Sequence, residues 1–405
     1  MRKRAVKTVK MGISRSEVKR ALLAIVALLT VLAVPVRGDV LADSKHFRLI
    51  DSIPIGGIAV SAQAVGDTYF ISGWQSGLYA YDISDPRAPV LLDHMTADEI
   101  QITHNENEDL ATNGEILLLS QFNRADPVNR LLVIDVKDPS DMKVIASLPG
   151  AGGHTLECLY DCKWAYASGS KQANAGLVID LQNPKEPKIA GEGFRAAMLD
   201  TPAHDVTEAR PGVVVTSSTP MFVLDTTDPV KPKVLTRTEN SDPHTGHNNI
   251  WPRDGKDRFL ISASEGSNNG RCELYDEDGK SLQVWDTTGW RTRGLRPLGT
   301  YTLTSGEGHP PVDALGVQGC SAHWAHEHPS FHNGGLVAMA VWSHGVRLLD
   351  VAGDGKVSEV GYFLKDVHGA VDVEWVTDRI LYVVEVGGGV GSFDIVEYTG
   401  PLPSR

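Results

Sequence analysis

The sequence predicts an all-β protein, a seven-bladed β-propeller whose blades are sheets of four strands. The first observation behind this prediction is an apolar phrase ending in aspartate that recurs along the chain. The second is the presence of 40 glycines and 22 prolines among 405 residues, which is typical of a fold with many turns. The third is that no long segment has helical periodicity, which argues against a helical solenoid.

The recurring phrase sets the number of blades. Four copies are clear, as in "RLLVIDVKDPSDM" and "AGLVIDLQNPKEP", and three later copies are degraded. The intervals between their aspartates are 53, 45, 45, 61, 64 and 44 residues, close to the length of a four-stranded blade. The seven aspartates are Asp82, Asp135, Asp180, Asp225, Asp286, Asp350 and Asp394.

One repeat, His154 to Phe194, divides into four strands, A to D. "HTLECLY" is strand A, "KWAYASG" strand B, "AGLVIDL" strand C and "PKIAGEGF" strand D. The C strands are continuous apolar runs, as expected for strands buried on both faces. Between C and D, the aspartate caps the turn through its side chain, and proline fixes the backbone without offering a donor.

The two ends of the repeat region complement each other. His46 to Gly57 has the pattern of strand D but precedes the first strand A, whereas the last repeat stops without a strand D. We expect the N-terminal segment to complete the seventh blade and close the ring. Closure removes the open sheet edges that would otherwise favour aggregation.

The phrases "LLVID", "GLVID" and "MFVLD" resemble the LVIVD repeat of secreted and surface β-propeller proteins from bacteria and archaea. The resemblance covers about residues 46–400 and is specific in the first four repeats. It implies a propeller but little about function, because that family is largely uncharacterised. The frame of histidine and aspartate in each repeat also resembles the WD-repeat blade, in which both residues are structural.

Residues 1–42 are predicted to be a signal peptide. Basic residues precede the sixteen-residue apolar run Ala21 to Val36, which is short for a membrane-spanning helix. Small residues favour cleavage after Ala42, with a cut after Gly38 as the alternative. We therefore expect an exported protein, secreted or held at the cell surface or in the periplasm, with residues 43–405 as one propeller domain. The mature chain would then have no membrane span.

The charge of the mature chain limits its partners. Loss of the leader removes nine basic and two acidic residues, which changes the net charge from −13 to −20. Such a surface repels nucleic acid and anionic lipid, so neither is an expected partner. We expect a monomer that binds a protein or a glycan.

Six of the seven repeats carry a histidine near the start of strand A. Because strand A is innermost in a propeller, we expect these side chains to gather at one mouth of the central channel. The long insertions of the chain fall on the same side, where function usually resides in a repeat fold. The six are His104, His154, His204, His247, His323 and His368.

Two interpretations of these histidines remain open. In the first, each imidazole is a structural group, copied with the repeat, that bonds a backbone carbonyl or a serine of strand B. In the second, three or four imidazoles hold a transition metal such as Cu, Zn or Mn, and an open coordination position makes the site catalytic. The candidate serines are Ser72, Ser120, Ser168 and Ser217.

The segment "HWAHEH" is the best local candidate for a metal site, because it holds His323, His326 and His328. Residues two apart on a strand share a face, so we expect His326 and His328 to point together. Glu327 and His332 are candidates for outer support of the ligands.

The chain has four cysteines, which in an exported protein suggests two disulfides. Cys158 and Cys162 flank a tight turn and form one expected pair. Cys272 and Cys320 fall in long insertions on the histidine side and form the other. The alternative is a thiol pair or a cysteine metal ligand.

Two classes of function follow from these observations. The first is a binding or scaffold propeller that presents its long-loop face to a protein or glycan partner. The second is a metal-dependent enzyme, an oxidase or lyase, with its metal held by histidines at the mouth of the channel. The sequence does not settle whether the protein is an enzyme, and no catalytic residue is assigned.

Overall fold

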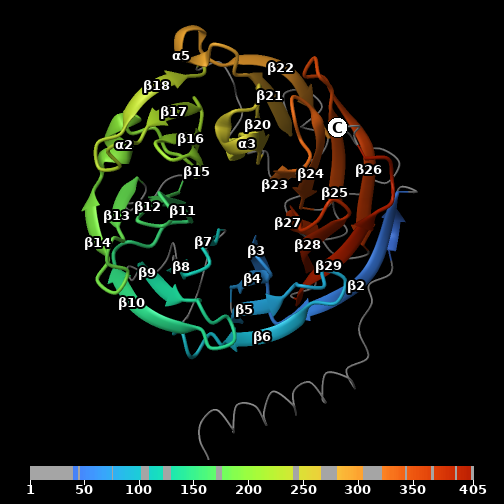
Figure 1. Ribbon diagram of the computed structural model, residues 1–405, viewed down its shortest axis with the longest axis horizontal. Coiled ribbons are helices and arrows are strands. Elements are labelled where there is room, and N and C mark those ends of the chain that lie inside the picture. Colours follow the sequence, from blue (N-terminus) through green and yellow to red (C-terminus); the bar gives the residue numbers. More distant parts are fainter. Residues whose placement is uncertain are drawn as a thin grey trace, which may run out of the picture. The chain divides into compact units, whose positions relative to one another are not determined.

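The computed structural model describes residues 40–43, 46–74, 76–101, 109–121, 129–169, 176–239, 246–265, 281–303, 322–342, 344–365, 369–387 and 390–402. Residues 38–405 form one compact unit. In this unit seven antiparallel sheets are arranged as blades around a central channel (Figure 1). The predicted seven-bladed propeller is confirmed.

In blades 1 to 4 the strands follow one another from the channel outward. Blade 1 contains β3 (Ala59–Val65), β4 (Thr68–Gly73), β5 (Gly77–Asp82) and β6 (Val90–Met95). Blade 2 contains β7 (Ala111–Thr112), β8 (Ile116–Gln121), β9 (Arg130–Asp135) and β10 (Lys143–Pro149). Blade 3 contains β11 (Thr155–Leu159), β12 (Trp164–Ser168), β13 (Leu177–Asp180) and β14 (Lys188–Gly191). Blade 4 contains β15 (Asp205–Arg210), β16 (Val213–Ser217), β17 (Phe222–Asp225) and β18 (Lys233–Arg237).

Blades 5 to 7 keep this order with additions. Blade 5 contains β19 (Gly246–Ile250), β20 (Phe259–Ser264), β21 (Leu282–Asp286) and β22 (Arg296–Tyr301). Blade 6 contains β23 (Ala322–Glu327), β24 (Gly335–Val341), β25 (Gly345–Val351) and β26 (Val357–Lys365). Blade 7 contains β27 (Gly369–Trp375), β28 (Ile380–Gly387), β29 (Val390–Tyr398) and β2 (Phe47–Ile55). The short helices are α2 (Gly193–Ala197), α3 (Pro252–Gly255) and α5 (Trp290–Arg293).

The aspartate that ends strand C caps the following turn, as its repetition predicts. Asp82 accepts the backbone N–H of Ser84 at 2.8 Å, and Asp180 accepts that of Gln182 at 2.9 Å. The bond from Ser84 also lowers the pKa of Asp82, because it stabilises the charged carboxylate. Asp135, Asp225 and Asp286 make the same contact two residues on.

The hydrophobic core lies between the blades rather than within any one of them. Each blade is a single sheet, so each of its faces must be covered by a neighbour. Phe70 and Leu78 of blade 1 therefore share an apolar cluster with Leu117 and Leu132 of blade 2. Strands C are buried along their length, whereas the outer strand of blade 2, β10, is half exposed.

The ring closes through β2, as expected from the sequence. β2 pairs with β29 from Phe47 opposite Tyr398 to Ile55 opposite Gly391. Next to this seam the ammonium of Lys365 is buried, 2.9 Å from both Glu385 and Asp394. Burial and then the neighbouring Asp394 raise the pKa of Glu385.

One strand was not expected. β1 (Val40–Asp43) pairs with β26 on the outside of blade 6 and makes that sheet five-stranded. It contains Ala42, after which we expected the leader to be cut. In the described part of the chain, no helix has both the length and the apolar character needed to cross a membrane.

We predict that Lys365→Met lowers the free energy of unfolding by about 3–5 kcal/mol, because it leaves buried carboxylates without their cation. Urea denaturation followed by tryptophan fluorescence measures the change. The matched control is Lys356→Met, which removes a lysine whose side chain is 84% exposed and should leave the midpoint unchanged. Equal midpoints for the two variants would contradict the role given to Lys365.

Candidate functional site in the central channel

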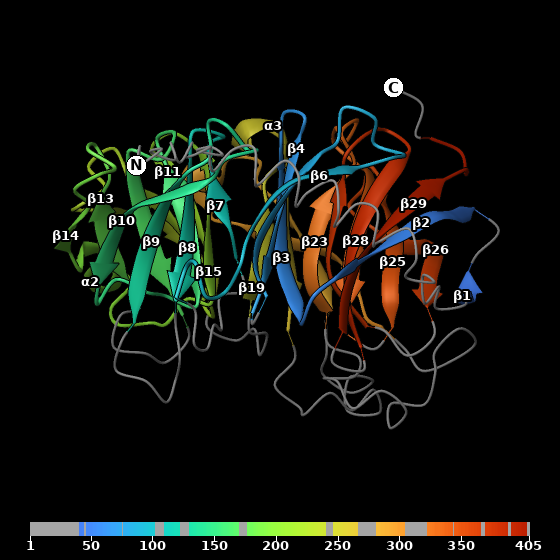
Figure 2. The same cartoon turned by 90° about the horizontal axis from the view of Figure 1, so that it is seen from below.

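The channel wall is made by strand A of each blade. β3, β7, β11, β15, β19, β23 and β27 are the innermost strands (Figure 1). We call the end of the channel where these strands begin the histidine end, and the end where they finish the turn end. α3 follows β19 and marks the turn end (Figure 2).

Four of the six strand-A histidines lie side by side at the histidine end. We call His154, His204, His247 and His323 the histidine row; each is buried and comes from a different, successive blade. Their successive ring centroids are 5.0, 4.0 and 4.2 Å apart. His104 and His368 lie outside the described residues.

The backbone sets the positions of these rings. The N–H of His154 donates to the carbonyl of Ser168 at 2.8 Å, and that of His204 donates to the carbonyl of Ser217 at 2.8 Å. These two histidines are therefore anchored to strand B of their own blades just before strand A begins. His247 and His323 are the second residues of β19 and β23, so all four imidazoles lie at the same end of the channel.

Four serines of strand B were candidate hydrogen-bond partners of the histidines. For three of them the structure describes bonds to other groups. Ser120 donates to the carbonyl of Gly153, and Ser168 shares a 2.7 Å bond with the hydroxyl of Thr155. Ser217 accepts the side-chain amide of Asn249 at 2.7 Å. The carbonyl alternative holds for His323, whose Nδ1 lies 2.5 Å from the oxygen of Val371 in blade 7.

The structure separates the three histidines of "HWAHEH". His323 belongs to the histidine row, whereas His326 lines the channel beyond it, with its Nε2 3.6 Å from Asp372. His328 is buried beyond the end of β23, where its ring bonds the carbonyl of Asp378 and packs edge-on against Trp375. His326 and His328 therefore do not point together, because His328 has left the strand.

A glutamate that sequence reasoning missed stands beside the histidine row. Glu265 follows directly after β20, and its ligand atom and those of His204 and His247 all lie within 4.8 Å of one another. The indole of Trp342 donates to Oε1 of Glu265 at 3.0 Å. No signal in the sequence sets this residue apart, because 51 acidic residues are present.

Toward the turn end the channel opens into a cavity of about 510 Å³. Its lining begins directly after the histidine row, with Asp205, Asn248 and Trp324, and reaches α3. The described lining holds one arginine, Arg253, and one histidine, His326. It also holds eight acidic residues: Asp109, Glu157, Asp205, Glu208, Asp254, Glu327, Asp372 and Glu374.

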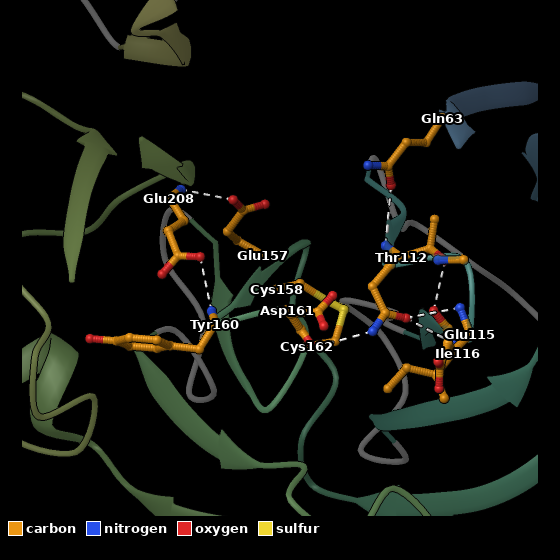
Figure 3. The surroundings of a disulfide bond; sticks show 12 residues. Gln63, Thr112, Glu115, Ile116, Glu157, Cys158, Tyr160, Asp161, Cys162 and Glu208 are labelled. Atoms are coloured by element: carbon orange, nitrogen blue, oxygen red, sulfur yellow. Dashed lines mark hydrogen bonds between the residues drawn. A yellow bond between two sulfur atoms is a disulfide. The ribbon is translucent and has the colours of Figure 1, made fainter. Parts of the chain in front are cut away.

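Several of these carboxylates bond the backbone of a neighbouring blade. Glu157 accepts the N–H of Glu208 at 2.8 Å, and Glu208 accepts the N–H of Tyr160 at 2.9 Å (Figure 3). Asp372 and Glu374 accept two N–H groups of β3 in the same way. Strand A needs these acceptors because it has only one partner strand in its own sheet.

Burial and crowding raise the pKa values of several of these acids. Desolvation raises the pKa of Glu374 to about 7 and that of Asp205 to about 8. The pKa values of Asp109 and Glu157 rise well above their usual range, first through burial and then through nearby carboxylates. Burial opposes the charge of His326, but Asp372 and other acids outweigh it and raise the pKa of His326 to about 9.

Two residues of this lining carry a side-chain oxygen that is itself buried and accepts no hydrogen bond from the described part of the chain. These oxygens are Oδ1 of Asp205 and Oδ1 of Asn248. The orientation of the Asn248 amide is set by its Nδ2, which donates to the carbonyl of Ala325 at 3.0 Å. Buried oxygen lone pairs of this kind favour a nearby hydrogen-bond donor or a cation.

One of the two expected disulfides is present. Cys158 and Cys162 are bonded across the turn between β11 and β12 (Figure 3). The carbonyl of Asp161 in this turn accepts the side-chain amide of Asn113 at 3.2 Å, which ties blade 3 to blade 2. Cys272 and Cys320 lie outside the described residues.

Comparisons with known proteins support the fold. No protein-family model and no curated protein matches the sequence. Among solved structures, the chain is similar to the WD40 β-propeller domain of Doa1, with 10% identity, a TM-score of 0.54 and coverage of 87% of this chain and 97% of that one. It is also similar to YCF48 bound to D1 peptide, with 10% identity, a TM-score of 0.54 and coverage of 89% and 99%. Sqt1 of Saccharomyces cerevisiae matches with 11% identity, a TM-score of 0.51 and coverage of 85% and 84%. At these identities the similarity establishes the propeller fold alone.

We predict that the protein becomes less stable as the pH rises from about 5 to about 9. Glu374 and Asp205 keep protons in the folded state that the unfolded chain releases near pH ~4, so raising the pH favours unfolding by up to ~1.4 kcal/mol per pH unit for each such group. His326 acts in the same direction, since its stabilising charge is present below pH ~6.5 and is lost through about 9.

Thermal unfolding across this pH range measures the effect. Glu374→Gln, which keeps an acceptor for the N–H of Ala64, should make the decline shallower. A melting temperature that rises toward pH 9 would contradict the assignment of protonated acids to the channel.

Proposed function

We propose that this protein is a binding propeller that takes a basic segment of a protein partner into its acidic channel. The observation that carries the proposal is the cavity of about 510 Å³ with eight acidic residues in its described lining. A lysine or arginine side chain would donate hydrogen bonds to the carboxylates of this lining. Its positive charge would also lower the raised pKa values of these carboxyl groups and so favour their ionised form.

The size and walls of the cavity favour a side chain with its flanking peptide. A volume of this size is within the range of about 300–1,000 Å³ typical of small-ligand sites, and too small for a folded domain. Trp251 and Trp324 are the two tryptophans of the described lining. The negative charge of the whole chain would speed the approach of a basic partner.

A propeller of similar fold supports a peptide partner, since YCF48 is described as bound to D1 peptide. The alternative partner, a glycan, would use the long-loop face, most of which lies outside the described residues. The second class, a metal-dependent enzyme, is favoured by one observation, the proximity of His204, His247 and Glu265.

We predict saturable binding of a short glycine-serine peptide that carries one central arginine, measured by calorimetry at low salt and about pH 8. Glu157→Gln with Glu374→Gln should weaken binding at least about tenfold, which corresponds to ~1.4 kcal/mol. The glutamines keep the backbone contacts of both sites. Binding should also weaken toward pH 5.5, because a proton then occupies Glu374, whose pKa is raised to about 7.

Two comparisons control this experiment. Asp98→Asn with Glu186→Gln removes the same charge from exposed positions and should leave the affinity unchanged. A peptide with neutral citrulline in place of arginine should not bind. Equal binding of the citrulline peptide, displacement by a neutral oligosaccharide, or no binding at millimolar peptide would overturn the proposal.

We also propose that the chain is exported, on the basis of its predicted leader and supported by the Cys158–Cys162 disulfide. Because β1 (Val40–Asp43) pairs with β26, cleavage after Gly38 would preserve this strand and cleavage after Ala42 would destroy it. We therefore predict that N-terminal sequencing of the exported protein begins at Asp39. A mature chain beginning at Asp43 would show that β1 is dispensable.

A further inference from the structure

We infer that His204, His247 and Glu265 form a binding site for one divalent transition-metal ion of the zinc type. The site is separate from the acidic cavity, whose lining includes none of these three residues. Of the eight histidines that the sequence suggested as metal ligands, this site uses two. Its third ligand is a glutamate that the sequence did not single out.

The geometry of the three side chains carries this inference. Each offers one ligand atom, and these atoms lie within 4.8 Å of one another. Metal–ligand bonds of about 2.0–2.2 Å place ligand atoms ~3.3 Å apart in a tetrahedral site. Small side-chain rotations would close the remaining separation. The histidine rings are already adjacent, with centroids 4.0 Å apart and planes inclined by 32°.

The chemistry of the three ligands selects the ion. Two imidazoles and one carboxylate leave at least one coordination position open, the arrangement of many zinc and iron sites rather than of closed structural ones. One carboxylate also partly balances the charge of a divalent cation inside a protein. Calcium and magnesium prefer sites made of oxygen, so the two imidazoles disfavour them.

The carboxylate is held by a second residue. Trp342 donates its indole N–H to Oε1 of Glu265 at 3.0 Å, which orients the carboxylate. Such outer contacts orient a ligand and are part of most metal sites. His323 adds a wall on the far side, because its ring contacts those of both His247 and Trp342.

His323 is itself oriented by the fold. Its Nδ1 lies 2.5 Å from the carbonyl oxygen of Val371, and a carbonyl can only accept, so Nδ1 carries the proton. In the neutral ring the lone pair is then on Nε2.

The experiment uses the full-length mature protein, purified without a tag and stripped with a chelator. Zn²⁺ and Co²⁺ are titrated separately, with the bound metal measured by elemental analysis after gel filtration. We expect one ion per chain, and a visible Co²⁺ absorption band whose intensity reports four- or five-coordination. Zn²⁺ should raise the melting temperature, because it binds only the folded chain with its ligands together.

Substitutions test the assignment of the ligands. His247→Ala should abolish stoichiometric binding, and Glu265→Gln should weaken it at least about tenfold while keeping the bond from Trp342. His332→Ala removes an exposed histidine and should leave binding unchanged. If His247→Ala lowers the folded fraction, the Glu265→Gln variant still tests the site. Its Co²⁺ spectrum should differ from that of the wild type if Glu265 is a ligand.

The outcome is independent of the proposed peptide binding. Glu157→Gln with Glu374→Gln should keep the metal, and Glu265→Gln should keep the peptide affinity. Wild-type protein that retains no Zn²⁺ or Co²⁺ at micromolar concentrations would overturn the inference. So would equal binding by wild type and the Glu265→Gln variant.

Discussion

The inner edge of each blade is the constraint on which the channel depends. Strand A has a partner on one side only, so its other backbone groups face a channel where they need hydrogen-bond partners. Side chains of the next blade provide them, as Glu157 and Asp372 do for N–H groups and Thr155 does for the carbonyl of His204. The wall is therefore polar by necessity. Using carboxyl groups for this task creates a cavity lined by acids, several of which have raised pKa values.

The same inner edge explains the histidine row. Each imidazole starts a strand A, and each strand A is one rotation about the axis from the next. Copies of a single residue therefore meet as neighbours, even where about 75 residues separate them, as for His247 and His323. The row meets Glu265 because strand B of blade 5 ends next to the start of strand A, and Glu265 is the first residue after that strand. In the proposed metal site, the histidines that the repeat places in blades 4 and 5 would also act as ligands.

Much of the fold follows from local patterns. The apolar run of strand C, the aspartate cap after it and the orphan strand D at the N-terminus predict seven blades and their closure, because all three act over a few residues or over one repeat. β1 was not predicted, since its pairing with β26 depends on an edge that only the assembled blade offers. The "HWAHEH" segment was misleading for a similar reason. The strand ends at Glu327, so the alternation of faces does not extend to His328.

The sequence alone thus specifies the repeat, the turn chemistry and the short-range Cys158–Cys162 bond, because each involves groups close together in the chain. The assembled ring alone selects which of the 51 acidic residues face the channel and which histidines meet a carboxylate. Those distances are set by the rotation from blade to blade and by packing between their faces. The spacing of residues along the chain determines neither the rotation nor the packing. Insertions of different length separate the blades in sequence without changing the positions of their inner strands.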